Sequence, residues 1–72
     1  MNTPYENLAN AIILSAVADY REVLRRWVQH PQKQAYISEK QSLERFFRSD
    51  WFSVLTAIDP EMLIAKLMQE VE

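Results

Sequence analysis

The chain has 72 residues, of which 49% are hydrophobic and 25% charged, and its net charge is −2. A domain of this size has a small core and depends on disulfides, a metal, self-association or efficient helix packing. Cysteine is absent, which excludes disulfides and thiolate metal sites and is typical of the reducing cytoplasm. We therefore expect one domain over residues 1–72, located in the cytoplasm and stabilised by helix packing or self-association.

Glycine is also absent, and its absence excludes two kinds of ligand site. Phosphate-binding loops and dinucleotide-binding turns need glycine, because backbone N–H groups must approach the ligand closely. Apolar residues recur at spacings of three and four, the period of a helix. No run approaches the roughly 18 apolar residues of a membrane span, and the N-terminus lacks a signal-peptide pattern. The sequence predicts an all-α bundle of three to four helices, with no membrane segment.

The first predicted helix is long. Thr3 is a plausible N-cap and Pro4 suits the first helical position. The helix should run to about His30, because Pro31 cannot easily continue it. The face expected in the core consists of Tyr5, Ala9, Ile12, Ile13, Ala16, Tyr20, Val23, Leu24 and Trp27.

The opposite face of this helix is apolar in its N-terminal half, where Ala11, Leu14 and Ala18 lie. A helix that is hydrophobic on nearly all sides is buried from more than one side. Either other helices of the domain cover these residues or a second molecule does. We predict that these three residues form a protein interface.

The second predicted helix lies between Pro31 and Ser49, and its start has two interpretations. Pro31 suits a first helical position and keeps the connection short. Ser38 would instead form a capping box with Gln41. We favour the early start, although Glu39 then interrupts the apolar stripe. That stripe consists of Ala35, Tyr36, Leu43, Phe46 and Phe47.

Two shorter helices are predicted to follow. Ser49 or Asp50 caps one that runs to about Ile58. Asp59 caps the last helix, with Pro60 at its first position. The apolar stripe expected on the last helix consists of Met62, Leu63, Leu67 and Val71.

The stretch ERFFRSDWFSVL, residues 44–55, concentrates aromatic side chains on both sides of a predicted turn. Phe46 and Phe47 end one helix, while Trp51 and Phe52 begin the next. Aromatic residues at helical spacing are usually core, so we interpret these four as a structural corner. A recognition role would instead require Trp51 or Phe52 to lie on the surface.

Charge is distributed unevenly along the chain. Residues 21–48 contain seven of the eight basic side chains, and residues 49–72 contain one lysine against five acids. Ion pairs such as Glu22–Arg26 and Glu44–Arg48, spaced by four residues, explain part of this pattern. A nucleic-acid or acidic-partner site is the alternative, although the net negative charge disfavours DNA binding. Its candidate residues are Arg21, Arg25, Lys40, Arg45 and Arg48.

The sequence offers no catalytic or metal-binding constellation. His30 is the single histidine and lies at a predicted helix end, where a structural role is expected. No set of histidine, cysteine and carboxylate ligands recurs around it at helical spacing. We expect no enzymatic activity, no cofactor and no metal.

Two segments, NAIILSAVADYREVLRRW and LERFFRSDWFSVLTAIDPEMLIAKL, support a resemblance. They resemble small helical proteins of phages, prophages and conjugative elements of Gram-positive bacteria, over about residues 8–68. In that group a segment similar to ERFFRSDWF is followed by an LT-x-x-D step and an LI-x-x-L helix. Pro60 stands where many relatives are expected to have glycine. The resemblance implies a mobile-element origin, and small proteins of that origin often bind a host component.

These observations lead to two hypotheses and a weaker third. The first is a non-enzymatic protein-binding module that self-associates and inhibits a host factor, in the manner of an anti-CRISPR or other anti-defence protein. The second is a small nucleic-acid-binding regulator that uses the basic segment 21–48. The third is a phage assembly or scaffold subunit.

Overall fold

The computed structural model describes residues 3–71, and these form four α-helices without any strand, which confirms the predicted all-α fold. The helices are α1 (Pro4–Gln29), α2 (Gln34–Phe47), α3 (Asp50–Leu55) and α4 (Pro60–Gln69).

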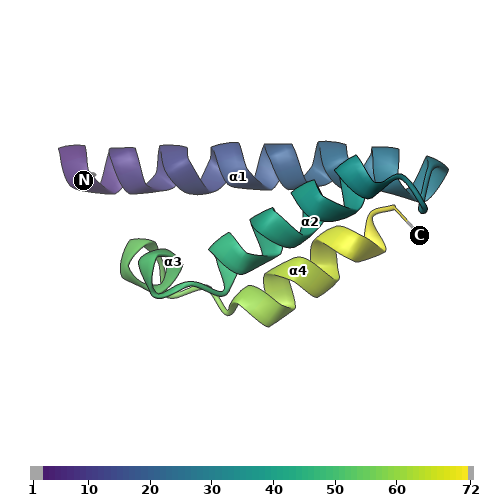
Figure 1. The fold of residues 1–72 in the computed structure, drawn as a ribbon. Coiled ribbons are helices and arrows are strands. Elements are labelled where there is room, and N and C mark those ends of the chain that lie inside the picture. The colour runs from purple at the N-terminus through teal and green to yellow at the C-terminus, as the bar shows by residue number, and fades with distance from the viewer. Residues whose placement is uncertain (1–2, 72) are drawn as a thin grey trace.

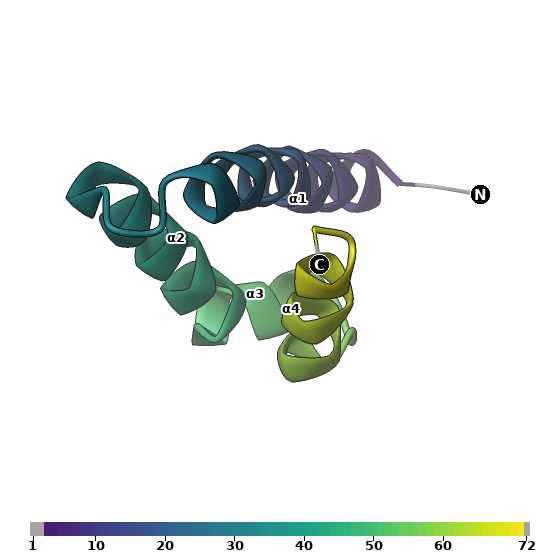
Figure 2. The ribbon, with the colours of Figure 1, turned by 90° about the vertical axis from the view of Figure 1, so that its right-hand side faces the viewer.

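The three shorter helices all lie on one side of α1 (Figures 1 and 2). α2 turns back along α1, α3 lies below its N-terminal half, and α4 returns beside α2. The opposite side of α1 faces no other helix. The result is elongated, with principal extents of 43 × 20 × 18 Å. The radius of gyration is 13.1 Å, against about 11 Å for an average domain of this length.

Side-chain caps begin three of the four helices where the sequence predicts them. Thr3 and Glu6 form a reciprocal capping box at the start of α1. Ser49 Oγ accepts from the Phe52 N–H at α3, and Asp59 accepts from the Glu61 N–H at α4. These local signals therefore locate the helix starts correctly.

The preferred start of the second helix is wrong, because α2 begins at Gln34 and at neither Pro31 nor Ser38. Residues 30–33 form a turn in which the Lys33 N–H donates to the His30 carbonyl over 3.1 Å. Because α2 packs back along α1, the chain must reverse direction here, and Pro31 lies inside that reversal. Lys33 occupies the N-cap without a side-chain hydrogen bond, so no capping residue signals this start.

The short third helix also ends earlier than predicted, at Leu55 instead of Ile58. Thr56 has extended backbone angles, and residues 56–59 lead to α4 without helical structure. The Thr56 hydroxyl accepts a hydrogen bond from the Ile58 N–H, which favours a turn over further helix.

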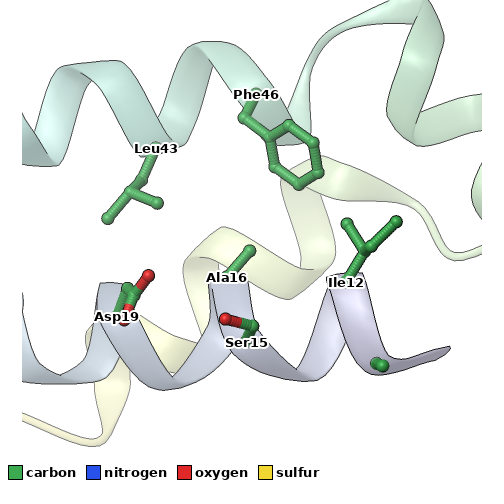
Figure 3. A pocket seen from close by; sticks show the side chains of 7 residues that line it. Ile12, Ser15, Ala16, Asp19, Leu43 and Phe46 are labelled. Carbon is green, nitrogen blue, oxygen red and sulfur yellow. The ribbon is translucent and has the colours of Figure 1, made fainter. Parts of the chain in front are cut away.

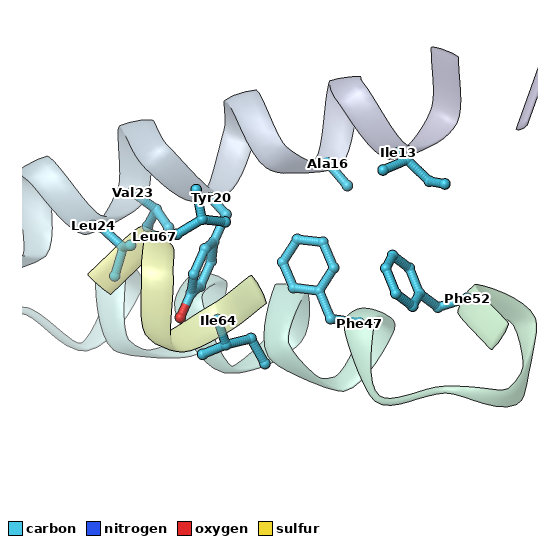
Figure 4. Packing of buried hydrophobic residues seen from close by; sticks show 9 residues of the cluster. All are labelled: Ile13, Ala16, Tyr20, Val23, Leu24, Phe47, Phe52, Ile64 and Leu67. Atoms are coloured by element: carbon cyan, nitrogen blue, oxygen red, sulfur yellow. The ribbon is translucent and has the colours of Figure 1, made fainter. Parts of the chain in front are cut away.

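One hydrophobic cluster joins all four helices (Figure 4). Its largest fully buried side chains are those of Tyr20, Phe47, Phe52, Leu24 and Val23. The predicted core face of α1 is correct over its central part. It is wrong for Tyr5, which is 59% exposed beyond the other helices. On α4, Met62 is exposed and Ile64 is buried in its place.

Candidate functional site: an uncovered face of the long helix

The aromatic corner is built from three phenylalanines. The Phe47 ring meets Tyr20 and Phe52 edge to face, with ring centres 5.4 and 5.5 Å apart. Phe46 is half-buried against the same group. Trp51 does not belong to this corner, because its side chain points outward and is 57% exposed. On the short helix α3 only one face reaches the core, and Phe52 lies on it.

A half-buried polar cluster lies beside the aromatic corner. The Tyr20 hydroxyl donates to Glu44 Oε2 over 2.6 Å, and Lys40 Nζ donates to the same oxygen over 2.7 Å. The pKa of Tyr20 is raised above its ordinary value, mainly by burial and to a smaller extent by the hydrogen bond to the Glu44 carboxylate. Burial acts to raise the pKa of Glu44, but hydrogen bonds from Lys40 and Tyr20 outweigh it, so this pKa is lowered. Lys40 also lies 4.9 Å from the centre of the Trp27 ring. Every group in this cluster has a partner, so its role is structural.

Two of the basic residues singled out in the sequence, Arg21 and Arg48, form ion pairs with distant parts of the chain. Arg21 on α1 pairs with Glu70 beyond α4, at 2.9 Å. Arg48 pairs with Glu61 on α4 at 2.7 Å, so the predicted Glu44–Arg48 pair is wrong. Hydrogen bonds from these guanidinium groups lower the pKa of Glu70 and of Glu61. The predicted Glu22–Arg26 pair is confirmed, at 2.6 Å.

Two of the five nucleic-acid candidates, Arg25 and Arg45, form no ion pair within residues 3–71. Both are exposed, and they lie on different helices, α1 and α2. The other three candidates each contact a carboxylate of this chain. The fold therefore neutralises most of the basic middle segment instead of gathering it into one charged surface.

The predicted interface residues Ala11, Leu14 and Ala18 are all exposed, and the Leu14 side chain is 67% exposed. None of the three belongs to the hydrophobic core that α1 shares with α2, α3 and α4, and Ala11 lies at the edge of this surface, where it also lines a groove between α1 and α2. Of the two ways in which this face could be covered, packing within the domain does not occur among the described residues. We call the surface formed by Asn7, Ala11, Leu14 and Ala18 the uncovered face.

A shallow groove of about 390 Å³ runs between α1 and α2, next to the uncovered face (Figure 3). Ile12 and Ala16 form one wall and Leu43 and Phe46 the other. Asp19 lies at its rim. Toward the N-terminus of α1, Leu8 is 62% exposed. Ile12 was expected in the core, but the wide separation of α1 and α2 at this end leaves it half-buried.

No family model, curated protein or solved structure matches this chain. Residues 3–71 contain no cluster of histidine, cysteine and carboxylate side chains that could hold a metal ion. In the same range, none of the helices is sufficiently long and apolar to cross a membrane. The uncovered face and the groove beside it are thus the features that need a functional explanation.

The sequence reasoning did not find Leu8 or the Tyr20–Glu44 hydrogen bond. Leu8 had a signal, because it lies beside Ala11 and Ile12 on the same apolar half-helix. The hydrogen bond had none, since its two residues are 24 positions apart and on different helices.

Proposed function

We propose that this protein is a non-enzymatic protein-binding module and that the uncovered face of α1 is its contact surface. The observation that carries the proposal is the exposure of Leu14, at 67%, between Ala11 and Ala18 on a helix whose other side is packed. Residues 7–18 contain no charged side chain, so this part of the helix gains little from contact with water. Protein interfaces are depleted of charge at their centre, and this segment has that composition.

The alternative of a nucleic-acid-binding regulator has less support. Arg21, Lys40 and Arg48 each contact a carboxylate at 2.9 Å or less, which would have to be displaced by a phosphate. Binding that depends on phosphate contacts weakens steeply as salt rises. A gel shift at low salt that disappears as salt rises would support this alternative. The mobile-element origin and the inhibition of a host defence factor stay predictions.

The proposed function can be tested by site-specific photo-crosslinking in the cells that make the protein. Leu14 is replaced by the photoreactive residue benzoylphenylalanine, and in a control the same residue replaces Gln41, which is exposed on α2. Both positions lie outside the core, so neither replacement should disturb folding. We expect protein adducts from position 14 and few from position 41. Equal yields at both positions, or no adduct at position 14, would contradict the proposal.

A further inference from the structure

The uncovered face has the residue pattern of a helix that packs against another helix. Asn7, Ala11, Leu14 and Ala18 follow one another at spacings of four, three and four residues. This spacing is that of the a and d positions in a coiled coil, whose side chains interlock with those of a facing helix. Two of the four are alanines, which let helix axes approach closely. An α-helix is therefore the partner element that this surface fits.

We propose that the partner is a second copy of this chain, bound antiparallel, with residue i of one α1 facing residue 25 − i of the other. This inference rests on the proposed function, because it uses the same surface. In this register Leu14 of each copy faces Ala11 of the other, and Ala18 faces Asn7. A large side chain thus meets a small one at the two central layers. The contact is isologous, as two-fold symmetry requires.

Charge decides between the antiparallel and the parallel arrangement. Arg25 continues the uncovered face one heptad after Ala18 and forms no ion pair among residues 3–71. In a parallel pair Arg25 would face its own copy, and facing like charges are destabilising. In the antiparallel register Arg25 lies beyond the start of the partner's α1 instead. Antiparallel helices also align their dipoles favourably.

The elongated chain exposes more surface than a compact monomer of its mass. The chain exposes 5190 Å², whereas a compact monomer of its mass exposes about 4,700 Å². A specific interface buries at least about 1,000 Å² in total, which corresponds to about 500 Å² from each copy. An interface near this lower limit is typical of weak complexes, so we expect a reversible dimer.

The remaining helices do not obstruct this arrangement. Because α2, α3 and α4 all lie on the far side of α1, the two α1 helices would form the middle layer and the other helices the outside (Figures 1 and 2). With helix axes about 10 Å apart and Cα atoms about 2.3 Å from each axis, facing Cα atoms lie about 5.4 Å apart. This distance lies within the range that a disulfide bridges.

Cysteine pairing tests the proposal directly, because the chain has no cysteine of its own. Ala11→Cys and Leu14→Cys are oxidised separately and as an equal mixture, and covalent dimers are identified by mass. Gln41→Cys serves as the control. We expect the mixture to yield mainly the mixed dimer, and each variant alone to yield no more dimer than the control. A second mixture, of Asn7→Cys with Ala18→Cys, should behave in the same way.

Each other outcome has a definite meaning. Strong self-linking of Ala11→Cys alone would overturn the antiparallel register and indicate a parallel pair. Control-level yields in both mixtures, with wild type monomeric by sedimentation at high micromolar concentration, would overturn self-association. If photo-adducts with another protein still form at position 14, the proposed function survives this failure. If neither adducts nor disulfides form, both proposals fail.

Discussion

The hydrogen bond from Tyr20 to Glu44 connects α1 to α2 and provides the sharpest test of the packing. Tyr20→Phe removes the hydroxyl and keeps the ring, which packs edge to face on Phe47. A hydrogen bond to a charged group contributes about 1.5–3 kcal/mol. Because Glu44 keeps its bond from Lys40, its carboxylate is not left without a partner, and we expect the lower end, about 1.5–2 kcal/mol. For a domain of this size such a loss lowers Tm by about 6–16 °C.

The measurement is urea and thermal unfolding followed by circular dichroism, with Tyr36→Phe as the matched control. Tyr36 is half-buried, and its hydroxyl forms no hydrogen bond within the described part of the chain. We expect the control to change the free energy of unfolding by less than about 0.5 kcal/mol. If Tyr20→Phe is no more destabilising than the control, the hydrogen bond contributes nothing to the stability of the fold. A double-mutant cycle with Glu44→Gln should show that the two changes are not additive.

Three further predictions concern the core, the helix caps and pH. Phe52→Ala should lower the free energy of unfolding by about 3–5 kcal/mol and leave the chain largely unfolded. Trp51→Ala should change this free energy by less than about 0.5 kcal/mol. Equal losses in urea titrations would show that Trp51 is packed. Thr3→Ala removes the capping box of α1 and should lower the free energy of unfolding by about 0.5–2 kcal/mol, whereas Thr3→Ser should keep most of that stability. An unchanged unfolding midpoint in Thr3→Ala would contradict the role of the cap. The pKa of Glu44 is lower in the folded state, so its contribution is present above its unfolded pKa of about 4.3 and is lost as pH falls through the folded value. Glu44→Gln should therefore lose less stability than wild type between neutral pH and about pH 3, and equal losses in urea titrations would contradict this sign.

The candidate site shows where reasoning from sequence succeeds and where it ends. The apolar N-terminal half of the face opposite the predicted core identified Ala11, Leu14 and Ala18 as an unusual surface of the first helix. It could not say whether the domain covers them, because coverage depends on which side of α1 the later helices occupy. They occupy the side that carries Tyr20, which packs on Phe47 of α2, since aromatic contacts bury more area than alanines can.

Helix starts with a capping side chain were determined by sequence alone. Thr3, Ser49 and Asp59 satisfy backbone N–H groups only a few residues away, so the signal and its effect are both local. Which segments form helices is also determined locally, because the spacing of apolar residues is a property of short segments. The start of α2 at Gln34 is not, since it is set by the reversal that lets α2 pack along α1.

Long-range pairing was decided only by the tertiary structure. Glu44 was expected to pair with Arg48 four residues later, but Glu44 instead accepts from Tyr20 and Lys40, and Arg48 pairs with Glu61. Ion pairs at helical spacing are weak, so other helices select between them: Tyr20 of α1 bonds to Glu44 beside Lys40, and Glu61 of α4 takes Arg48. For the same reason Trp51 and Phe52, adjacent in sequence, differ entirely in exposure, because only packing selects the face of α3 that is buried.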